Sequence, residues 1–221
     1  MFNILFSHTD FYVVEKPANV SFHSEQETGF FALLCQQISE TLYPVHRLDK
    51  VTSGLVIVAR NKNSAALFGD MFAQKDKSGI SKFYVAVAMG KPSKKQGWVK
   101  GDLVKSRRGC YKLQKTQQNP SITRFQSTLI EPGLRLYLLQ PVTGKTHQLR
   151  VVLKSLSTPI LGDERYGGEI AERAHLHAYA LRFMFKEQQF QFILPPSGGV
   201  FNHDKCKSLL EQWQQPWTAF N

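Results

Sequence analysis

A single carboxylate, Asp49, lies among basic side chains on a loop directly before an apolar run. His46, Arg47 and Lys50 are its neighbours in sequence, and nearby cations favour the ionised form of an acid. An ionised carboxylate on a loop can act as a nucleophile or as a general base. The alternative is a structural Asp in a turn, paired with Arg47, and the local pattern does not separate the two readings.

The element that must position Asp49 follows it directly in the chain. Residues 55–59, Leu-Val-Ile-Val-Ala, form a short apolar run rich in β-branched side chains and are preceded by Thr-Ser-Gly. This pattern predicts a buried strand with a tight turn in front of it. Asp49 is therefore expected at the mouth of a rigid sheet, where reactive groups are usually presented.

The stretch around Asp49 resembles the RluA-type family of RNA pseudouridine synthases. The family signature His-Arg-Leu-Asp-x-x-Thr-Ser-Gly is matched at every fixed position by residues 46–54. The resemblance implies that Asp49 is the catalytic carboxylate that starts the isomerisation of uridine. It also implies that His46 and Arg47 bind the substrate. Whether Asp49 attacks the ribose or the uracil stays open.

The length and composition fit one globular protein with a sizeable core, since the chain has 221 residues and 42% hydrophobic content. No run approaches the roughly 18 apolar residues of a membrane span. The first residues do not resemble a secretion signal, so a cytoplasmic protein is expected. Cys35, Cys110 and Cys206 are widely separated, which argues against a disulfide framework and a thiolate metal site.

The formal charge of +11 is concentrated in residues 60–115. This window holds fourteen Lys and Arg against three Asp, whereas the remainder holds fourteen residues of each sign. A field of one sign on a quarter of the chain attracts polyanions, so RNA is the expected partner. Trp98 and Tyr111 interleave with these cations, a mixture suited to phosphates and unpaired bases. The alternative is a solvated, Lys-rich face.

Residues 82–90 predict a strand that ends at a Gly turn. They match in part the family pattern Lys-x-Tyr-x-Ala-x-Val-x-Gly. The resemblance makes Tyr84 a catalytic residue that packs on the target base and can exchange a proton, and it makes Lys82 a substrate contact. Without the resemblance, Tyr84 would be an aromatic of the core.

Apolar residues at i, i+3, i+4 and i+7 from Leu149 predict a helix that buries one side. Residues 143–153 resemble the family's Thr-Gly-[Arg/Lys]-x-His-Gln-[Ile/Leu]-Arg-x-His-Leu motif. The resemblance implies that the guanidinium fork of Arg150 holds the catalytic carboxylate, and that Lys145 and His147 bind the substrate. Val152 replaces a His that is common in the family and is expected to pack.

Gly144-Lys145-Thr146, between a strand and a helix, mimics a phosphate-binding P-loop. A P-loop needs a Gly five residues before Gly144, where this chain has Leu139. A nucleotidase, which would bind ATP, is therefore disfavoured. The other alternative is an RNA-binding protein without activity, and the presence of both Asp49 and Arg150 argues against it.

Three further stretches extend the resemblance. Residues 9–20 predict a strand and a Lys-Pro turn in which Asn19 replaces a Gly, and Asn tolerates a left-handed backbone. Residues 162–167 match Gly-Asp-x-x-Tyr-Gly, and 176–178 match Leu-His-Ala. His175 and His177 could be taken for a metal pair, but no third ligand is evident and structural histidines are expected.

The motifs follow one another in family order over roughly residues 10–195. The implied fold is a single α+β catalytic domain over 1–221, with a mixed, largely antiparallel sheet, flanking helices, a basic central cleft and a C-terminal tail at 203–221. No RNA-binding module is expected before the first strand. The remaining elements expected are helices over 30–43, 63–74 and 205–215, short strands in a basic excursion over 91–122, and strands over 121–130 and 134–140.

The implied reaction breaks the glycosidic bond of a uridine, rotates the uracil and reattaches it through C5, with no cofactor and no metal. The expected substrate is structured RNA, either rRNA or tRNA. A uridine inside such a structure must flip out to reach a pocket, and Arg47 is the residue expected to fill the vacated space. Neither a membrane nor an obligatory protein partner is expected, and the chain is predicted to be a monomer.

Overall fold

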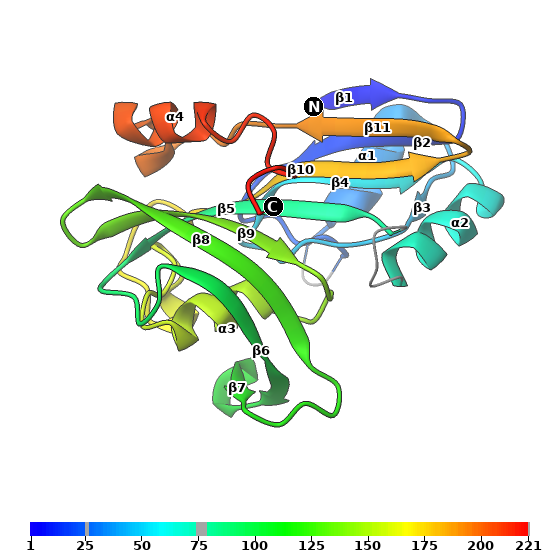
Figure 1. Ribbon diagram of the computed structural model, residues 1–221. Coiled ribbons are helices and arrows are strands. Elements are labelled where there is room, and N and C mark those ends of the chain that lie inside the picture. Colours follow the sequence, from blue (N-terminus) through cyan, green and yellow to red (C-terminus); the bar gives the residue numbers. More distant parts are fainter. Residues whose placement is uncertain (25–26, 74–78, 221) are drawn as a thin grey trace.

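The computed structural model describes residues 1–24, 27–73 and 79–220, except for the side chain of Arg108. Its strands form one sheet in the order β1-β2-β4-β10-β5-β9-β8-β6-β7, with β11 also paired to β10 and β3 to β4 (Figure 1). The elements are β1 Ile4–Ser7, β2 Phe11–Lys16, α1 Phe30–Ile38, β3 Tyr43–Pro44, β4 Ser53–Ala59, α2 Lys62–Ala73, β5 Ser81–Met89, β6 Gln96–Lys105, β7 Tyr111–Gln114, β8 Ser121–Glu131, β9 Leu134–Pro141, α3 Gln148–Ser155, β10 Leu176–Phe185, β11 Gln188–Ile193 and α4 Asp204–Glu211.

The sheet is mixed and largely antiparallel, as predicted. Only β4 and β10 run parallel among the described strand pairs, through His177 beside Ser53 and Ala178 beside Gly54. β10 comes late in the chain but lies between β4 and β5. It therefore joins the strand that follows Asp49 to the strand that carries Tyr84.

The strand predicted at 55–59 is confirmed as β4, which begins two residues earlier at Ser53. All of its residues are buried. β4 pairs with β2 along one edge and with β3 and β10 elsewhere, and side chains from both of its faces pack in the core. Burial on both faces explains why this strand has a continuous apolar run instead of an alternating one.

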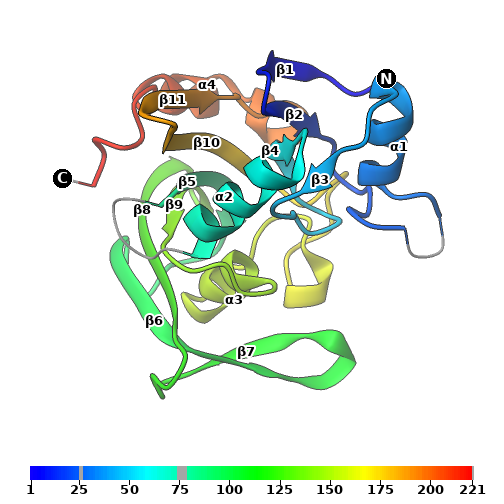
Figure 2. The ribbon, with the colours of Figure 1, turned by 90° about the vertical axis from the view of Figure 1, so that its right-hand side faces the viewer.

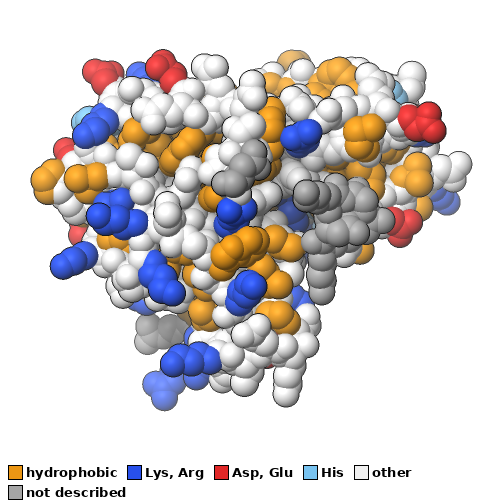
Figure 3. Space-filling view, in the orientation of Figure 1, with side chains coloured by type: hydrophobic (Ala, Val, Ile, Leu, Met, Phe, Trp, Pro, Cys, Tyr) orange, Lys and Arg blue, Asp and Glu red, His pale blue; other side chains and the backbone are white. Residues whose placement is uncertain are grey.

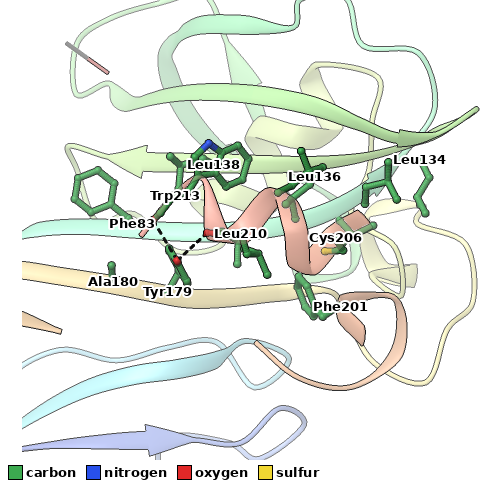
Figure 4. Close-up of a cluster of buried hydrophobic side chains, with 14 of the residues drawn as sticks. Phe83, Leu134, Leu136, Leu138, Tyr179, Ala180, Phe201, Cys206, Leu210 and Trp213 are labelled. Carbon is green, nitrogen blue, oxygen red and sulfur yellow. Dashed lines mark hydrogen bonds between the residues drawn. The ribbon is translucent and has the colours of Figure 1, made fainter. Parts of the chain in front are cut away.

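Helices cover both faces of the central strands. On one face, Leu136 and Leu138 of β9 pack against Leu210 and Trp213 from α4 and the segment after it (Figure 4). On the opposite face, β5, β8 and β9 pack against α3. Val152 is fully buried in this second cluster, so its predicted packing role is confirmed.

Two predicted helices are shorter than expected. The helix predicted at 30–43 ends at Ile38, because Ser39 takes a left-handed conformation with φ of 59° and residues 43–44 pair with β4 instead. The helix predicted at 205–215 is α4, which ends at Glu211. The helix predicted at 63–74 is confirmed as α2, although its last residue lies outside the described ranges. No prediction covered β1.

The basic excursion at 91–122 contains a longer strand than expected. β6 has ten residues, and it pairs with both β8 and β7. The β6–β7 hairpin extends beneath α3, away from the rest of the sheet (Figure 2). None of the described helices is long and apolar enough to cross a membrane.

Candidate active site

A cavity of about 290 Å³ opens between the loop that carries Asp49, strand β5 and the loop before α3. The structure places Asp49, Tyr84 and Arg150 together in its wall. The other predicted site residues also line this cavity, namely His46, Arg47, Lys82, Lys145 and His147. Residues as far apart in sequence as His46 and Arg150 therefore meet at one place.

A buried lysine that the sequence reasoning missed holds the Asp49 loop. Lys16 is 0% exposed, and its Nζ donates to the carbonyl oxygens of Lys50 at 3.2 Å and Thr52 at 2.9 Å. Burial lowers the pKa of Lys16 to about 7, opposed by the negative charge of Asp49. The signal in the sequence was the Lys-Pro pair at the end of β2, which we interpreted only as a turn.

The turn after Lys16 has the predicted backbone. Asn19 takes the left-handed conformation with φ of 64°. This confirms that Asn can replace the Gly of the family pattern at this position.

The predicted pair between Arg150 and Asp49 exists, but its geometry differs from the prediction. Arg150 Nη1 lies 3.5 Å from Asp49 Oδ2. The guanidinium fork, Nε and Nη2, instead donates two hydrogen bonds of 2.7 Å to the buried carboxylate of Asp163. The prediction that the fork holds Asp49 is wrong, because the turn that follows α3 places a second carboxylate closer to Arg150. Arg150 is therefore close to the carboxylates of both Asp49 and Asp163.

Asp49 has no ion pair with Arg47 among the described residues. Arg47 is exposed and lines the cavity, while the carboxylate of Asp49 faces Arg150. The alternative in which Asp49 is a turn residue paired with Arg47 is therefore wrong. Arg47 stays available to a ligand in the cavity.

The expectation that His46 contributes positive charge beside Asp49 is wrong. His46 Nε2 accepts the backbone N–H of Ile57 at 2.8 Å, and its ring lies 4.4 Å from the ring of Phe72. Enclosure of the ring, reinforced by the charge of Lys82, lowers the pKa of His46 to about 3. His46 is thus neutral, and it ties the start of the loop to β4.

Tyr84 combines the two roles that the sequence left open. Its ring packs against two core clusters, one that contains α3 and one that contains β2 and β4, and it also lines the cavity. Burial raises the pKa of Tyr84 well above its usual value, and the negative charge of Asp49 raises it further. The phenol is therefore held in its protonated form.

Two lysines lie at the rim and differ in their contacts. Lys82 Nζ lies 5.6 Å from the centre of the Phe72 ring, and burial lowers the pKa of its ammonium. Lys145 Nζ donates to the side chain of Asn119 at 2.7 Å. Both side chains line the cavity.

The two histidines near β10 are hydrogen-bonded within the protein. His177 Nδ1 lies 2.7 Å from Ser53 Oγ, and Nε2 lies 2.9 Å from the carbonyl oxygen of Leu194. His175 Nε2 accepts the backbone N–H of Val200 at 3.0 Å. Their predicted structural role is confirmed. Among the described residues, no group of three or more His, Cys, Asp and Glu is arranged to hold a metal ion.

A second cavity, of about 610 Å³, lies on the other side of the Asp49 loop and shares Arg47, Asp49, His147 and Arg150 with the first. Lys50, Arg165 and Arg173 add further cations to its wall. Lys and Arg also spread over the lower half of the face in Figure 3, where Figure 1 places β6, β7 and β8. The wall of the second cavity also carries Asp49, Asp163, Glu164 and Glu172, so its Lys and Arg outnumber its carboxylates by only one, and the basic central cleft stays a prediction. Lys75, Lys77 and the side chain of Arg108, counted in the basic window, lie outside the described part.

Comparison with known proteins identifies the class to which this site belongs. The model of the RNA pseudouridylate synthase family matches residues 10–155. A Haemophilus influenzae protein named as an RNA pseudouridine synthase is 46% identical over 202 residues, which cover 90% of this chain and 89% of that protein. The chain therefore belongs to the RNA pseudouridylate synthase family.

This membership makes the chain an RNA pseudouridine synthase, an isomerase that converts uridine to pseudouridine in RNA. The alternatives of a P-loop nucleotidase and of an RNA-binding protein without activity are wrong. The fold agrees, because β9, which precedes Gly144, has antiparallel neighbours on both sides instead of the parallel sheet of a doubly wound nucleotide-binding fold.

Other relatives match over smaller or more distant regions. A Rickettsia bellii protein named ribosomal large subunit pseudouridine synthase C is 40% identical over 130 residues, which cover 57% of this chain and 42% of that protein. The solved structure of human RNA pseudouridylate synthase domain containing 1 superposes with a TM-score of 0.76 at 23% identity, covering 97% of this chain and 95% of that chain. The second comparison shows that the fold is shared.

Proposed function

We propose that Asp49, Tyr84 and Arg150 carry out the isomerisation in the smaller cavity. The observation that supports this assignment is their meeting in one wall, although they come from three separate parts of the chain. A cavity of about 290 Å³ lies near the lower end of the range for small-ligand sites, as expected for a single base. The larger cavity beside it leaves room for the adjoining sugar-phosphate chain.

The reaction rearranges one nucleotide without a net change in composition. The bond between C1′ and N1 breaks, the uracil rotates, and a bond forms between C1′ and C5. The hydrogen lost from C5 is balanced by the hydrogen gained at N1. Asp49 acts as a nucleophile or base toward the ribose or the uracil. Arg150 holds Asp49 in place through Nη1.

A uridine in a structured RNA must leave its stack to enter this cavity. Arg47 is exposed at the mouth and is our candidate for filling the vacated space. His46, Lys82, Lys145 and His147 are proposed to bind the substrate around the base. We propose that rRNA is the first target to examine and tRNA the second, since the Rickettsia bellii relative is named for the large ribosomal subunit.

We further propose that the chain acts as a monomeric, cytoplasmic, single catalytic domain that needs no cofactor and no protein partner. Mapping pseudouridines in cellular RNA with and without the gene tests the function and finds the target. The expected result is the loss of one or a few pseudouridines from rRNA or tRNA. An unchanged pattern in all cellular RNA would contradict the proposal.

Replacing Tyr84 separates stacking on the base from proton exchange. Tyr84→Ala should weaken RNA binding about tenfold, because stacking of one base on an aromatic contributes roughly 1–3 kcal/mol. Tyr84→Phe should retain the affinity and lose turnover, because it keeps the ring but removes the exchangeable proton. Binding and single-turnover assays on the same RNA measure both effects. If Tyr84→Phe turned over at the wild-type rate, the hydroxyl of Tyr84 would have no role in the chemistry.

The cations of the β6–β7 hairpin should contribute to RNA affinity. Lys105 and Lys112 are exposed there. Lys105→Gln with Lys112→Gln should weaken binding and lower the slope of log affinity against log salt by roughly one per lost phosphate contact. Lys205→Gln with Lys207→Gln removes the same charge from the exposed face of α4 and should leave the slope unchanged. Equal effects of the two pairs would show that only net charge matters.

A further inference from the structure

Tyr166 lies directly behind two residues that share the cavity wall with Asp49. Its hydroxyl oxygen is 2.8 Å from Nδ1 of His147. Its ring lies 4.8 Å from the guanidinium carbon of Arg150. Tyr166 is buried and does not line either cavity that borders Asp49, so it acts on a ligand only through these two neighbours.

The hydrogen bonds of the Tyr166 hydroxyl define which nitrogen of His147 carries the proton. The same oxygen accepts the backbone N–H of Tyr111 at 3.0 Å. Because a backbone N–H only donates, the phenolic hydrogen remains to be given, and among the described residues Nδ1 of His147 is the acceptor within reach. Burial lowers the pKa of His147, which favours the neutral ring, and a neutral ring that accepts at Nδ1 carries its proton on Nε2.

The Nε2 edge of His147 has no hydrogen-bond partner in the described ranges, and the ring lines both cavities. The backbone of His147 is also unusual, with φ of 55° and ψ of 18°, a left-handed conformation at the start of α3. For a residue other than Gly this costs of order 1 kcal/mol or more, and such strain gathers at functional sites.

One tight turn supplies the supports for both Arg150 and His147. Asp163 and Tyr166 are three residues apart, and the N–H of Tyr166 donates to the carbonyl of Asp163 at 3.0 Å. Gly162 has φ of 82°, and a Cβ there would collide with the backbone of Arg173. This close packing fixes the turn, so the carboxylate and the phenol move together.

We propose that Tyr166 is a positioning residue that fixes His147 as a donor of Nε2–H to an acceptor oxygen of the bound nucleotide. The oxygen belongs either to the uracil or to a phosphate next to the target uridine. The inference rests on the proposed function of the cavity, since it assumes that the nucleotide binds beside Asp49. In this proposal, His147 recognises an acceptor oxygen of the nucleotide. Tyr166 determines which tautomer of His147 is present.

Tyr166→Phe tests the kinetic part, because it keeps the ring beneath Arg150 and removes only the hydroxyl. The value of kcat/KM should fall about five- to tenfold, the size of one net hydrogen bond to the substrate. Tyr43→Phe is the matched control, since this half-buried tyrosine of β3 lies away from both cavities. His147→Gln keeps a side-chain N–H near the Nε2 position, and adding Tyr166→Phe to it should cause no further loss.

Nitrogen NMR of the His147 ring tests the tautomer without reference to catalysis. In the wild-type protein, Nδ1 should be unprotonated and Nε2 protonated, whereas Tyr166→Phe should show both tautomers. A protonated Nδ1 in the wild type would overturn the proposal. This readout does not depend on turnover, so failure here is distinguishable from failure of the proposed function, which Asp49→Asn tests.

Modified substrates identify the acceptor and give the decisive outcome. RNAs carrying 2-thiouridine or 4-thiouridine at the target weaken a uracil acceptor, and methylphosphonate linkages beside it remove a phosphate oxygen. With one of these substrates, Tyr166→Phe should have no further effect, because the bond it supports is already lost. If the five- to tenfold loss persists with every modified substrate, His147 does not donate to the nucleotide and the proposal is overturned.

Discussion

Asp49→Asn is expected to abolish pseudouridine formation while leaving RNA affinity within a factor of about two. The substitution keeps the size of the side chain but removes both nucleophilic and basic character, and losing a catalytic group of this kind lowers rates by at least about 10²–10⁴-fold. Affinity should persist because Asp49 is one small, partly exposed group, with 21% of its side chain accessible, in a site that several Lys and Arg side chains line. Single-turnover formation of pseudouridine and equilibrium RNA binding measure the two quantities.

Asp70→Asn is the matched control, since this exposed carboxylate of α2 lies outside both cavities. It should turn over at the wild-type rate. If Asp49→Asn retained turnover at a rate comparable with that control, the assignment of Asp49 as the catalytic carboxylate would be wrong. Loss of turnover together with loss of RNA affinity would also contradict the account, because it would make Asp49 a binding residue.

Arg150→Met is expected to remove activity and to destabilise the fold by about 3–5 kcal/mol, the usual cost of leaving one member of a buried ion pair without its partner. The reason is Asp163, which is buried and receives both hydrogen bonds of the guanidinium fork. Without Arg150, the carboxylate of Asp163 stays buried with no cation beside it. Urea unfolding of the variant and of the wild-type protein measures the lost free energy of unfolding.

A double variant separates stability from catalysis. Arg150→Met with Asp163→Leu replaces the ion pair by apolar side chains of similar size and should recover much of the lost free energy of unfolding. It should not recover turnover, because Asp49 still lacks its cation. Recovery of turnover in the double variant would show that Arg150 acts only by neutralising Asp163. Full stability of the single variant would show that the buried pair contributes nothing to the fold.

The strands around the site could be predicted from short-range patterns. The apolar run at 55–59, the strand at 82–90 and the hairpin joined at Pro132-Gly133 all follow from periodicity and turn residues, and the structure confirms them. Helix α3 also follows from its spacing of apolar residues. These elements are determined locally, because each buries a face that its own sequence defines.

The ends of elements were less predictable where contacts between distant segments decide them. Apolar spacing continues past Ile38, but pairing of residues 43–44 with β4 takes that stretch out of the helix. β1 has exposed and half-exposed residues, with no pattern that distinguishes it from a loop. Its position depends on pairing with β2, and no local sequence pattern indicates that pairing.

The sequence selected candidate residues that the structure brings to one cavity, but it did not indicate how their charges are arranged. His46 reads as a cation beside Asp49, yet Phe72 and the backbone of Ile57 keep it neutral. Asp163 was visible in the Gly-Asp-x-x-Tyr-Gly segment, but nothing local shows that it takes the fork of Arg150. The pairing of Arg150 with Asp163 depends on the turn after α3, and the surroundings of His46 depend on α2 and β4, so both are properties of the fold.

The most direct measurement is a crystal structure of Asp49→Asn bound to an RNA stem-loop that contains the target uridine. We predict that the uracil is flipped out of the RNA and lies on the ring of Tyr84, with residue 49 beside its ribose or base. We also predict that the fork of Arg150 still holds Asp163. A target uridine that stays stacked in the RNA, or an RNA bound at a surface remote from this cavity, would contradict the account.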